Sequence, residues 1–201
     1  MSLVRSIWQP SYPRLSAVSH SLLLLLIHVV FRAFSNNSLE ILMIAVGSEA
    51  PDFKLTSQFD TEFSLSEFKG EKNVMLVFYP FDWSATWSRE IPKIELMIDR
   101  FKEADTQVLG VSIDSKHSHK KWAESFGGVS FPLLQDFHPK GAMATSYGTY
   151  LENKGFAARS TVIVDKQGSV RYSVMADGER IIGELLVECQ KVNSWATGNL
   201  F

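Results

Sequence analysis

A continuous apolar run limits the folds open to this chain. Residues 73–80 read NVMLVFYP, and the apolar side chains at successive positions indicate a strand buried on both faces. Pro80 ends the run, because proline has no N–H to donate to a neighbouring strand. A second run of this kind, TQVLGVSID, occupies residues 106–114. Two strands buried on both faces require a sheet that is covered on each side.

The segment between these runs has the periodicity of a helix. Over residues 84–103 apolar side chains recur at steps of three or four, at Ile91, Ile94, Ile98 and Phe101. Pro92, near the start of this segment, is expected to kink the helix. Further patterns predict a hairpin at 53–68 around Asp60, helices at 118–128, 139–148 and 178–193, a strand at 131–136 and a hairpin at 160–175. This order predicts an α/β fold with one mixed central sheet, helices on both faces and an N-terminal β-hairpin.

Charge and cysteine content exclude several classes of function. The net charge is −2, so there is no basic surplus for nucleic-acid binding. Because Cys189 is the single cysteine, an internal disulfide is excluded. No group of cysteines and histidines has the spacing of a zinc site, so neither a metal nor another cofactor is expected. His117 and His119 stand two residues apart in KHSHKK. A solvated helix face is the ordinary interpretation of this pair, and a weak metal site is the alternative.

The first 42 residues differ in composition from the rest. They contain three arginines, many serines and no acidic residue before Glu40. Their apolar run, 22–31, is about half the roughly twenty residues that cross a bilayer, so no stable membrane span is expected. A signal peptide or anchor, a transit peptide, and a natural start at Met43 all stay open. The predicted domains are a 1–42 extension and a 43–201 folded domain, cytoplasmic if translation starts at Met43 and otherwise secreted or organellar.

Several segments of the predicted domain resemble one protein family. They are VGSEAPDFKL (46–55), VMLVFYPFDWS (74–84), GVSIDS (110–115), FPLLQDFHPKGAMATSYG (131–148) and AARSTVIVDKQGSVRY (157–172). Together they are similar to the alkyl hydroperoxide reductase/thiol-specific antioxidant family of peroxiredoxins, over about residues 46–192. The resemblance implies a thioredoxin-like fold. Residues 136–148 in particular resemble the one-cysteine bacterial subgroup, which lacks a resolving thiol.

The active-site pattern of that family is present here with one exception. The pattern is Pro-x-x-x-Thr/Ser-x-x-Cys with a distant arginine, and Pro80, Ser84 and Arg159 occupy three of its positions. Glu90 matches an acid that many members carry three residues after the cysteine. The peroxidatic cysteine itself is replaced by Trp87. These residues are the candidate site.

The chemistry of the family explains why these residue types matter. A thiolate attacks the O–O bond, and a helix N-terminus with free N–H groups and the Arg159 guanidinium would both favour the thiolate. Ser84 would donate a hydrogen bond, and Pro80 would shield the pocket. An indole offers only an N–H donor and is far bulkier than a thiol. One hypothesis is that Arg159 stacks on the Trp87 ring as a cation–π pair.

Each candidate residue also has a purely structural interpretation. Pro80 ends a strand, Ser84 is a helix cap, and Arg159 pairs with a surface carboxylate. The set as a whole, inside a matching frame, favours an inherited site. Cys189 falls on the apolar stripe of the last predicted helix, with Ile181, Ile182, Leu185, Leu186 and Val192, and is expected to be a buried structural thiol.

The resemblance implies thiol-dependent reduction of hydroperoxides by a homodimer. Because Trp87 replaces the thiol, we expect an inactive or severely impaired peroxidase that persists as a scaffold or binding protein. Phe81, Trp83 and Trp87 are expected at a dimer interface or in the core. Two alternatives stay open: an active peroxidase, if Trp87 is not the natural residue or Cys189 substitutes, and a small anion-binding domain that uses Ser84 and Arg159.

Overall fold

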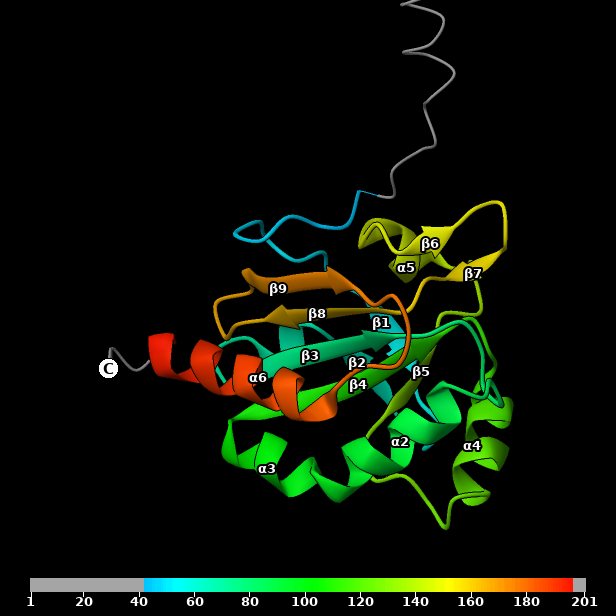
Figure 1. Cartoon of the computed structure of the whole chain (residues 1–201). Coiled ribbons are helices and arrows are strands. Elements are labelled where there is room, and N and C mark those ends of the chain that lie inside the picture. Colours follow the sequence, from blue (N-terminus) through cyan, green and yellow to red (C-terminus); the bar gives the residue numbers. More distant parts are fainter. Residues whose placement is uncertain (1–41, 197–201) are drawn as a thin grey trace, which may run out of the picture. The chain divides into compact units, whose positions relative to one another are not determined.

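The centre of the fold is a five-stranded mixed sheet. The computed structural model describes residues 42–196, and its sheet has the strand order β5-β4-β3-β8-β9 (Figure 1). The middle strand β3 (Asn73–Phe78) is buried at every position. It pairs in parallel with β4 (Thr106–Ser112) and antiparallel with β8 (Ser160–Val164). β5 (Leu133–Gln135) lies parallel to β4, and β9 (Val170–Met175) lies antiparallel to β8. The predicted mixed sheet is confirmed.

Alternation along β3 produces a hydrophobic core on each face of the sheet. Met75 and Val77 belong to the first core, which is covered by the helices α2 (Trp87–Leu96), α3 (Ile98–Glu103), α4 (Lys116–Glu124) and α6 (Ile182–Ala196). Leu76 and Phe78 belong to the second core, which is covered by η1 (Ser66–Phe68), α5 (Ala142–Ser146) and the residues around them. Figure 1 shows the long helices gathered on one side of the sheet. Helices therefore cover both faces, as predicted, but the four larger ones share one face.

The N-terminal hairpin is confirmed. β1 (Lys54–Thr56) and β2 (Glu62–Ser64) pair antiparallel, with Leu55 opposite Phe63. Asp60 lies in the turn with φ of 61°, a left-handed conformation that aspartate tolerates better than most residues. A second short hairpin, β6 (Tyr150–Leu151) with β7 (Phe156–Ala157), was not predicted. Its strands are two residues long, too short to show a period in the sequence.

The four predicted helices differ from the observed ones at their ends, and two of the differences bear on the site. The helix expected over 84–103 begins at Trp87 and is divided into α2 and α3 at Met97, whose φ and ψ are −105° and 7°. The interruption lies beyond Pro92, which stays inside α2. The last helix begins at Ile182, so Ile181 lies before it and is 63% exposed. The prediction that Ile181 belongs to the buried stripe is therefore wrong, because helical spacing does not apply to a residue outside the helix.

The predicted extension lies almost entirely outside the described residues. The division into residues 1–42 and 43–201 therefore stays a prediction. The first described residues pack on the domain, since the Ile44 amide donates to the Tyr147 carbonyl at 3.1 Å. Within residues 42–196 no helix combines the length and the apolar character that a membrane crossing requires.

Candidate functional site

Trp87 lies in the core of the domain. Its side chain is fully buried and stacks on Tyr79, with 4.4 Å between ring centroids and 18° between ring planes. Trp122 of α4 approaches both rings, at 6.2 Å from Trp87 and 5.9 Å from Tyr79. The indole also contacts the sheet, because a Cβ on Gly110 would lie 3.6 Å from its Cζ2 atom. Trp87 is thus a packed core side chain, and its full burial excludes the interface role considered for it.

The start of α2 explains how Trp87 is positioned. A turn precedes the helix, in which Trp83 has φ of 62°, and the N-cap residue Thr86 makes no side-chain capping bond. The Ser88 amide donates to the Ser84 carbonyl at 2.9 Å, and the Arg89 amide donates to the Thr86 carbonyl at 3.1 Å. Backbone carbonyls therefore take up amides of the first turn. The expectation of free N–H groups at this helix end is wrong for these amides.

Ser84 and Pro80 lie next to the cluster rather than inside it. The Ser84 hydroxyl is buried and has no hydrogen-bond partner among the described residues, so the helix-cap interpretation of this side chain is wrong. Pro80 is partly buried and follows Tyr79, whose amide still donates to the Val111 carbonyl at 3.1 Å. This position agrees with the strand-ending interpretation of Pro80. Neither residue has a described contact that ties its side chain to Arg159.

A buried carboxylate joins two arginines beside Trp87. Glu90 is fully buried, and its Oε1 atom accepts a 2.6 Å hydrogen bond from the Arg180 backbone amide. Its Oε2 atom lies 3.2 Å from Nη1 of Arg180, and Oε1 lies 3.8 Å from Nε of Arg159. Arg159 thus pairs with a buried carboxylate, and the prediction of a surface partner is wrong. The structure brings Trp87, Glu90 and Arg159 into one cluster.

Arg180 is the site residue that sequence reasoning missed. Its guanidinium carbon lies 5.4 Å from the centroid of the Trp87 ring, a cation–π contact, and its Nη2 donates to the Phe78 carbonyl at 2.5 Å. The hypothesis assigned this contact to Arg159, and the structure assigns it to Arg180. Burial lowers the pKa of Arg180 to about 10, although Glu90 acts in the opposite direction, so it stays a cation at neutral pH. An arginine just before a helix carries no pattern that separates it from an exposed one.

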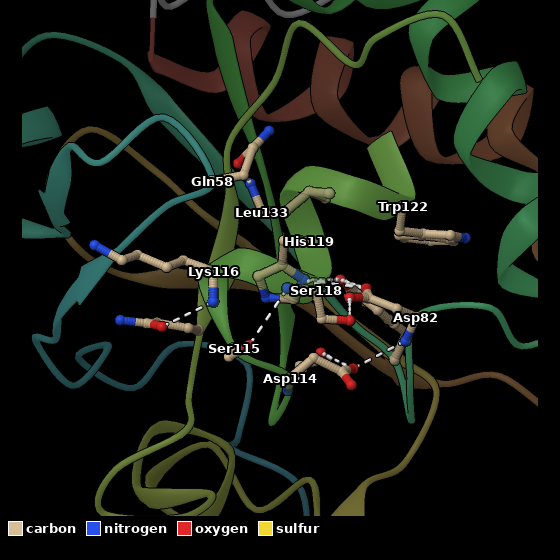
Figure 2. Close-up of polar contacts among 12 residues, drawn as sticks. Gln58, Asp82, Asp114, Ser115, Lys116, Ser118, His119, Trp122 and Leu133 are labelled. Atoms are coloured by element: carbon tan, nitrogen blue, oxygen red, sulfur yellow. Dashed lines mark hydrogen bonds and ion pairs between the residues drawn. The ribbon is translucent and has the colours of Figure 1, made fainter. Parts of the chain in front are cut away.

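A second polar cluster anchors the loop that precedes α2 (Figure 2). The buried Asp82 carboxylate accepts hydrogen bonds from the Tyr79 hydroxyl at 3.0 Å and from the Ser118 hydroxyl at 2.7 Å. Nδ1 of His119 lies 3.0 Å from both carboxylate oxygens, and its Nε2 lies 3.2 Å from the Leu134 carbonyl. The Asp82 amide in turn donates to Asp114 at 2.9 Å. The loop is therefore tied to α4 and to the end of β4.

Tyr79 connects the two clusters. Its ring stacks on Trp87 and its hydroxyl donates to Asp82. Desolvation, with the charge of Asp82 as the next cause, raises the pKa of Tyr79 well above its ordinary value, so the phenol stays neutral.

The two histidines of α4 differ in exposure. His119 is fully buried in this network, whereas His117 is exposed. The solvated-face prediction is wrong for His119, and the described residues contain no group of three or more side chains suited to a metal ion.

Cys189 lies on the buried face of α6. The thiol is fully buried, 3.8 Å from the sulfur of Met75, and desolvation raises its pKa to about 12. The structural interpretation of this cysteine therefore agrees with its environment.

The aromatic residues of the loop that precedes α2 are accessible to solvent. Phe81 is 39% exposed and Trp83 is 61% exposed. Phe81 packs edge-on against Phe156, with ring centroids 4.9 Å apart.

Known proteins with similar sequences carry the names of peroxide-reducing enzymes. Alkyl hydroperoxide reductase E of Mycobacterium tuberculosis is 37% identical over 133 residues, which make up 66% of this chain and 86% of that protein. The chloroplastic 2-Cys peroxiredoxin BAS1 of Spinacia oleracea is 34% identical over 139 residues, 65% of this chain and 52% of that protein. The similarity of this chain thus extends to both bacterial and plant proteins.

Solved structures and the family model lead to the same assignment. The reduced 2-Cys peroxiredoxin of Plasmodium vivax matches with a TM-score of 0.69 and 27% identity, covering 77% of this chain and 99% of that chain. Mycobacterium tuberculosis AhpC matches with a TM-score of 0.67 and 23% identity, which speaks for the fold alone. The thioredoxin-like fold is thereby confirmed. The model of the AhpC/TSA family matches residues 46–173, more than half of the sequence, and the chain belongs to this family.

Proposed function

We propose that this chain is a peroxiredoxin-like protein that does not reduce hydroperoxides and that acts as a non-catalytic scaffold or binding protein. One observation carries the proposal: the side chain at the thiol position is a fully buried indole. An indole N–H is a donor without a nucleophilic lone pair, whereas attack on an O–O bond needs a thiolate. The stacked Tyr79 ring and the Arg180 guanidinium enclose the indole, so it occupies the space beside them.

The surrounding charges support the view that the site is a relic of a thiol site. Arg159 and Glu90 occupy family positions and lie within 3.8 Å of each other. A guanidinium such as that of Arg159 beside a cysteine would favour its thiolate form. Here the guanidinium of Arg180, which also pairs with Glu90, faces a side chain that does not ionise. The residues that would assist the reaction are present, and the reacting atom is absent.

The alternative of an active enzyme through Cys189 has little support. A thiol attacks as its thiolate, and the pKa of Cys189 is raised to about 12. Its fully buried position also separates it from dissolved peroxide. The protein would also be active if the natural residue at position 87 were a cysteine. Resequencing from the source tests that alternative.

We propose further that the protein forms a homodimer through the loop that precedes α2. Phe81 and Trp83 are exposed on this loop, and aromatic side chains are enriched at protein interfaces. The anchoring of Asp82 holds the loop in a defined conformation before any partner binds. Sedimentation of the unmodified chain and of Trp83→Ser tests this: the dimer is expected to weaken in the variant.

Peroxide consumption tests the main proposal. The assay measures loss of hydrogen peroxide and of an organic hydroperoxide with a dithiol reductant, for the unmodified chain, Trp87→Cys, Trp87→Ser and Cys189→Ser. We expect no turnover by the unmodified chain or Trp87→Ser, and turnover in Trp87→Cys. Trp87→Ser is the matched control, since it opens the same space without supplying sulfur. Turnover by the unmodified chain that disappears in Cys189→Ser would overturn the proposal.

A further inference from the structure

Buried donors without partners are concentrated at the relic site. In the described part of the chain, nine buried side-chain nitrogen and oxygen atoms lack a hydrogen-bond partner. Five of the nine belong to the cluster of Trp87, Glu90, Arg159 and Arg180, which is the relic site, and a sixth is the hydroxyl of Ser84 next to it. The Glu90 oxygen and Arg180 Nη1 among them face each other at 3.2 Å, so the four atoms that remain unpaired are N–H and O–H donors. A buried donor without an acceptor is unfavourable, and a set of them indicates a missing acceptor.

The formal charges of the site also indicate that a negatively charged group is missing. Arg159 and Arg180 carry two positive charges, and Glu90 is the carboxylate paired with both. The nearby Glu179 is taken up by Arg89 at 2.8 Å and Lys93 at 2.5 Å. One positive charge of the cluster is therefore left over. In a thiol site the thiolate would supply the second negative charge, and Trp87 does not.

We propose that the relic site binds a small monovalent anion, such as nitrate or a halide, whose charge takes the place of the absent thiolate. This rests on the proposed function only in that position 87 holds no thiol. The anion class follows from the excess of one positive charge and from the N–H and O–H donors. The small size follows from the packing of the site, because the fully buried indole is enclosed by Tyr79 and Arg180.

Arg159 is the residue that holds the anion. Arg180 is engaged, since its Nη2 donates to Phe78, its Nη1 faces Glu90, and its side chain is 3% exposed. The Arg159 side chain is 16% exposed, and it makes no hydrogen bond within the described residues; its one pairing is the 3.8 Å approach to Glu90. A guanidinium that solvent reaches at one edge and that has free donors is suited to an entering anion.

Urea unfolding in nitrate tests the proposal. Sodium nitrate replaces sodium gluconate at constant ionic strength, so that screening by salt stays the same while the small anion is exchanged. For a dissociation constant of about 10 mM, about 100 mM nitrate lowers the unfolding constant roughly tenfold. Arg159→Gln is expected to lose this stabilisation, and the control Lys154→Gln to keep it. Equal nitrate effects in the unmodified chain and in Arg159→Gln, or no effect in the unmodified chain, overturn the proposal.

Two variants that differ by one atom test the charge argument itself. In Trp87→Cys the thiolate restores the missing negative charge, so the nitrate effect is expected to disappear. In Trp87→Ser the space is the same and the charge is still missing, so the effect is expected to persist. The ultraviolet absorbance of the thiolate shows its ionisation. A nitrate effect that survives in a Trp87→Cys protein with an ionised thiol contradicts the proposal.

A measurement on the unmodified chain covers the case in which Arg159→Gln does not fold. Chloride-35 NMR is expected to show a line broadened by the protein and narrowed again when nitrate displaces chloride. A line that nitrate leaves unchanged counts against the site. These readouts involve no peroxide, so a negative anion result leaves the proposed loss of peroxidase activity standing, and peroxidase turnover does not decide the anion result.

Discussion

Replacing Trp87 by alanine is expected to lower the free energy of unfolding by about 3–5 kcal/mol, the range of buried Trp-to-Ala substitutions. The side chain is fully buried, and a tryptophan of this kind removes about 150–250 Å² from water, which at about 25 cal/mol per Å² is about 4–6 kcal/mol. The stacked pair with Tyr79 adds about 0.5–1.5 kcal/mol. Partial collapse of neighbouring side chains into the space recovers some of this sum.

Urea denaturation followed by far-ultraviolet circular dichroism is the measurement, because it does not depend on the fluorescence of the deleted indole. Leu96→Ala is the control: it removes a large apolar side chain from the same helix, at a residue that is 88% exposed, and is expected to change stability by about 0.5 kcal/mol or less. A Trp87→Ala loss no larger than that of the control would refute the assignment of the indole to the core. It would also remove the structural reason for the proposed loss of activity.

Three further perturbations have expected outcomes. Because the pKa of Cys189 is raised from 9.0 to about 12, its contribution to stability is complete below pH 9.0 and is lost as the pH rises toward 12; the urea midpoint should fall over this interval, and Cys189→Ala should lack that part of the fall. Asp82→Asn breaks the buried pair with His119 and should lower the free energy of unfolding in urea by about 3–5 kcal/mol. The control Asp60→Asn breaks an exposed pair with Lys116 and should cost less than about 1 kcal/mol. Equal losses would contradict the anchoring role of Asp82. Gly110→Ala would place a Cβ 2.7 Å from Leu133 and should lower stability by about 1–3 kcal/mol, and an unchanged midpoint would show that Leu133 moves freely.

Burial patterns were predictable from the sequence, because they repeat along the chain. β3 reads as an apolar run since the sheet buries both of its faces, and the hairpin around Asp60 reads as two apolar alternations. Cys189 was placed in the core by its helical spacing from Leu185. In each case the physical cause acts on several residues at a regular interval. Single sequences carry that signal directly.

Contacts between single polar side chains were not predictable, because no periodic pattern in the sequence indicates them. His119 and Asp82 are 37 positions apart, and the bond between Arg180 and the Phe78 carbonyl spans 102. Lysines around His119 indicated a solvated face, yet its own turn of α4 faces the sheet. The family pattern pointed to Arg159, and only the fold showed that a second arginine covers the indole. Spatial pairing of this kind depends on the topology rather than on the local sequence.

The residues of the relic site differ in how well the fold alone explains them. Glu90 accepts the Arg180 amide, and so it fixes the segment before α6 against α2 whatever residue stands at position 87. Arg180 satisfies a strand carbonyl and packs on the indole, which are also structural contacts. Arg159 differs, because a 3.8 Å approach to Glu90 does not require a guanidinium, and a neutral side chain there would remove the excess charge. A stability measurement on Arg159→Gln without nitrate therefore separates two cases: a more stable variant means that the fold tolerates Arg159 for the sake of a ligand, and a less stable one means that Arg159 serves the fold.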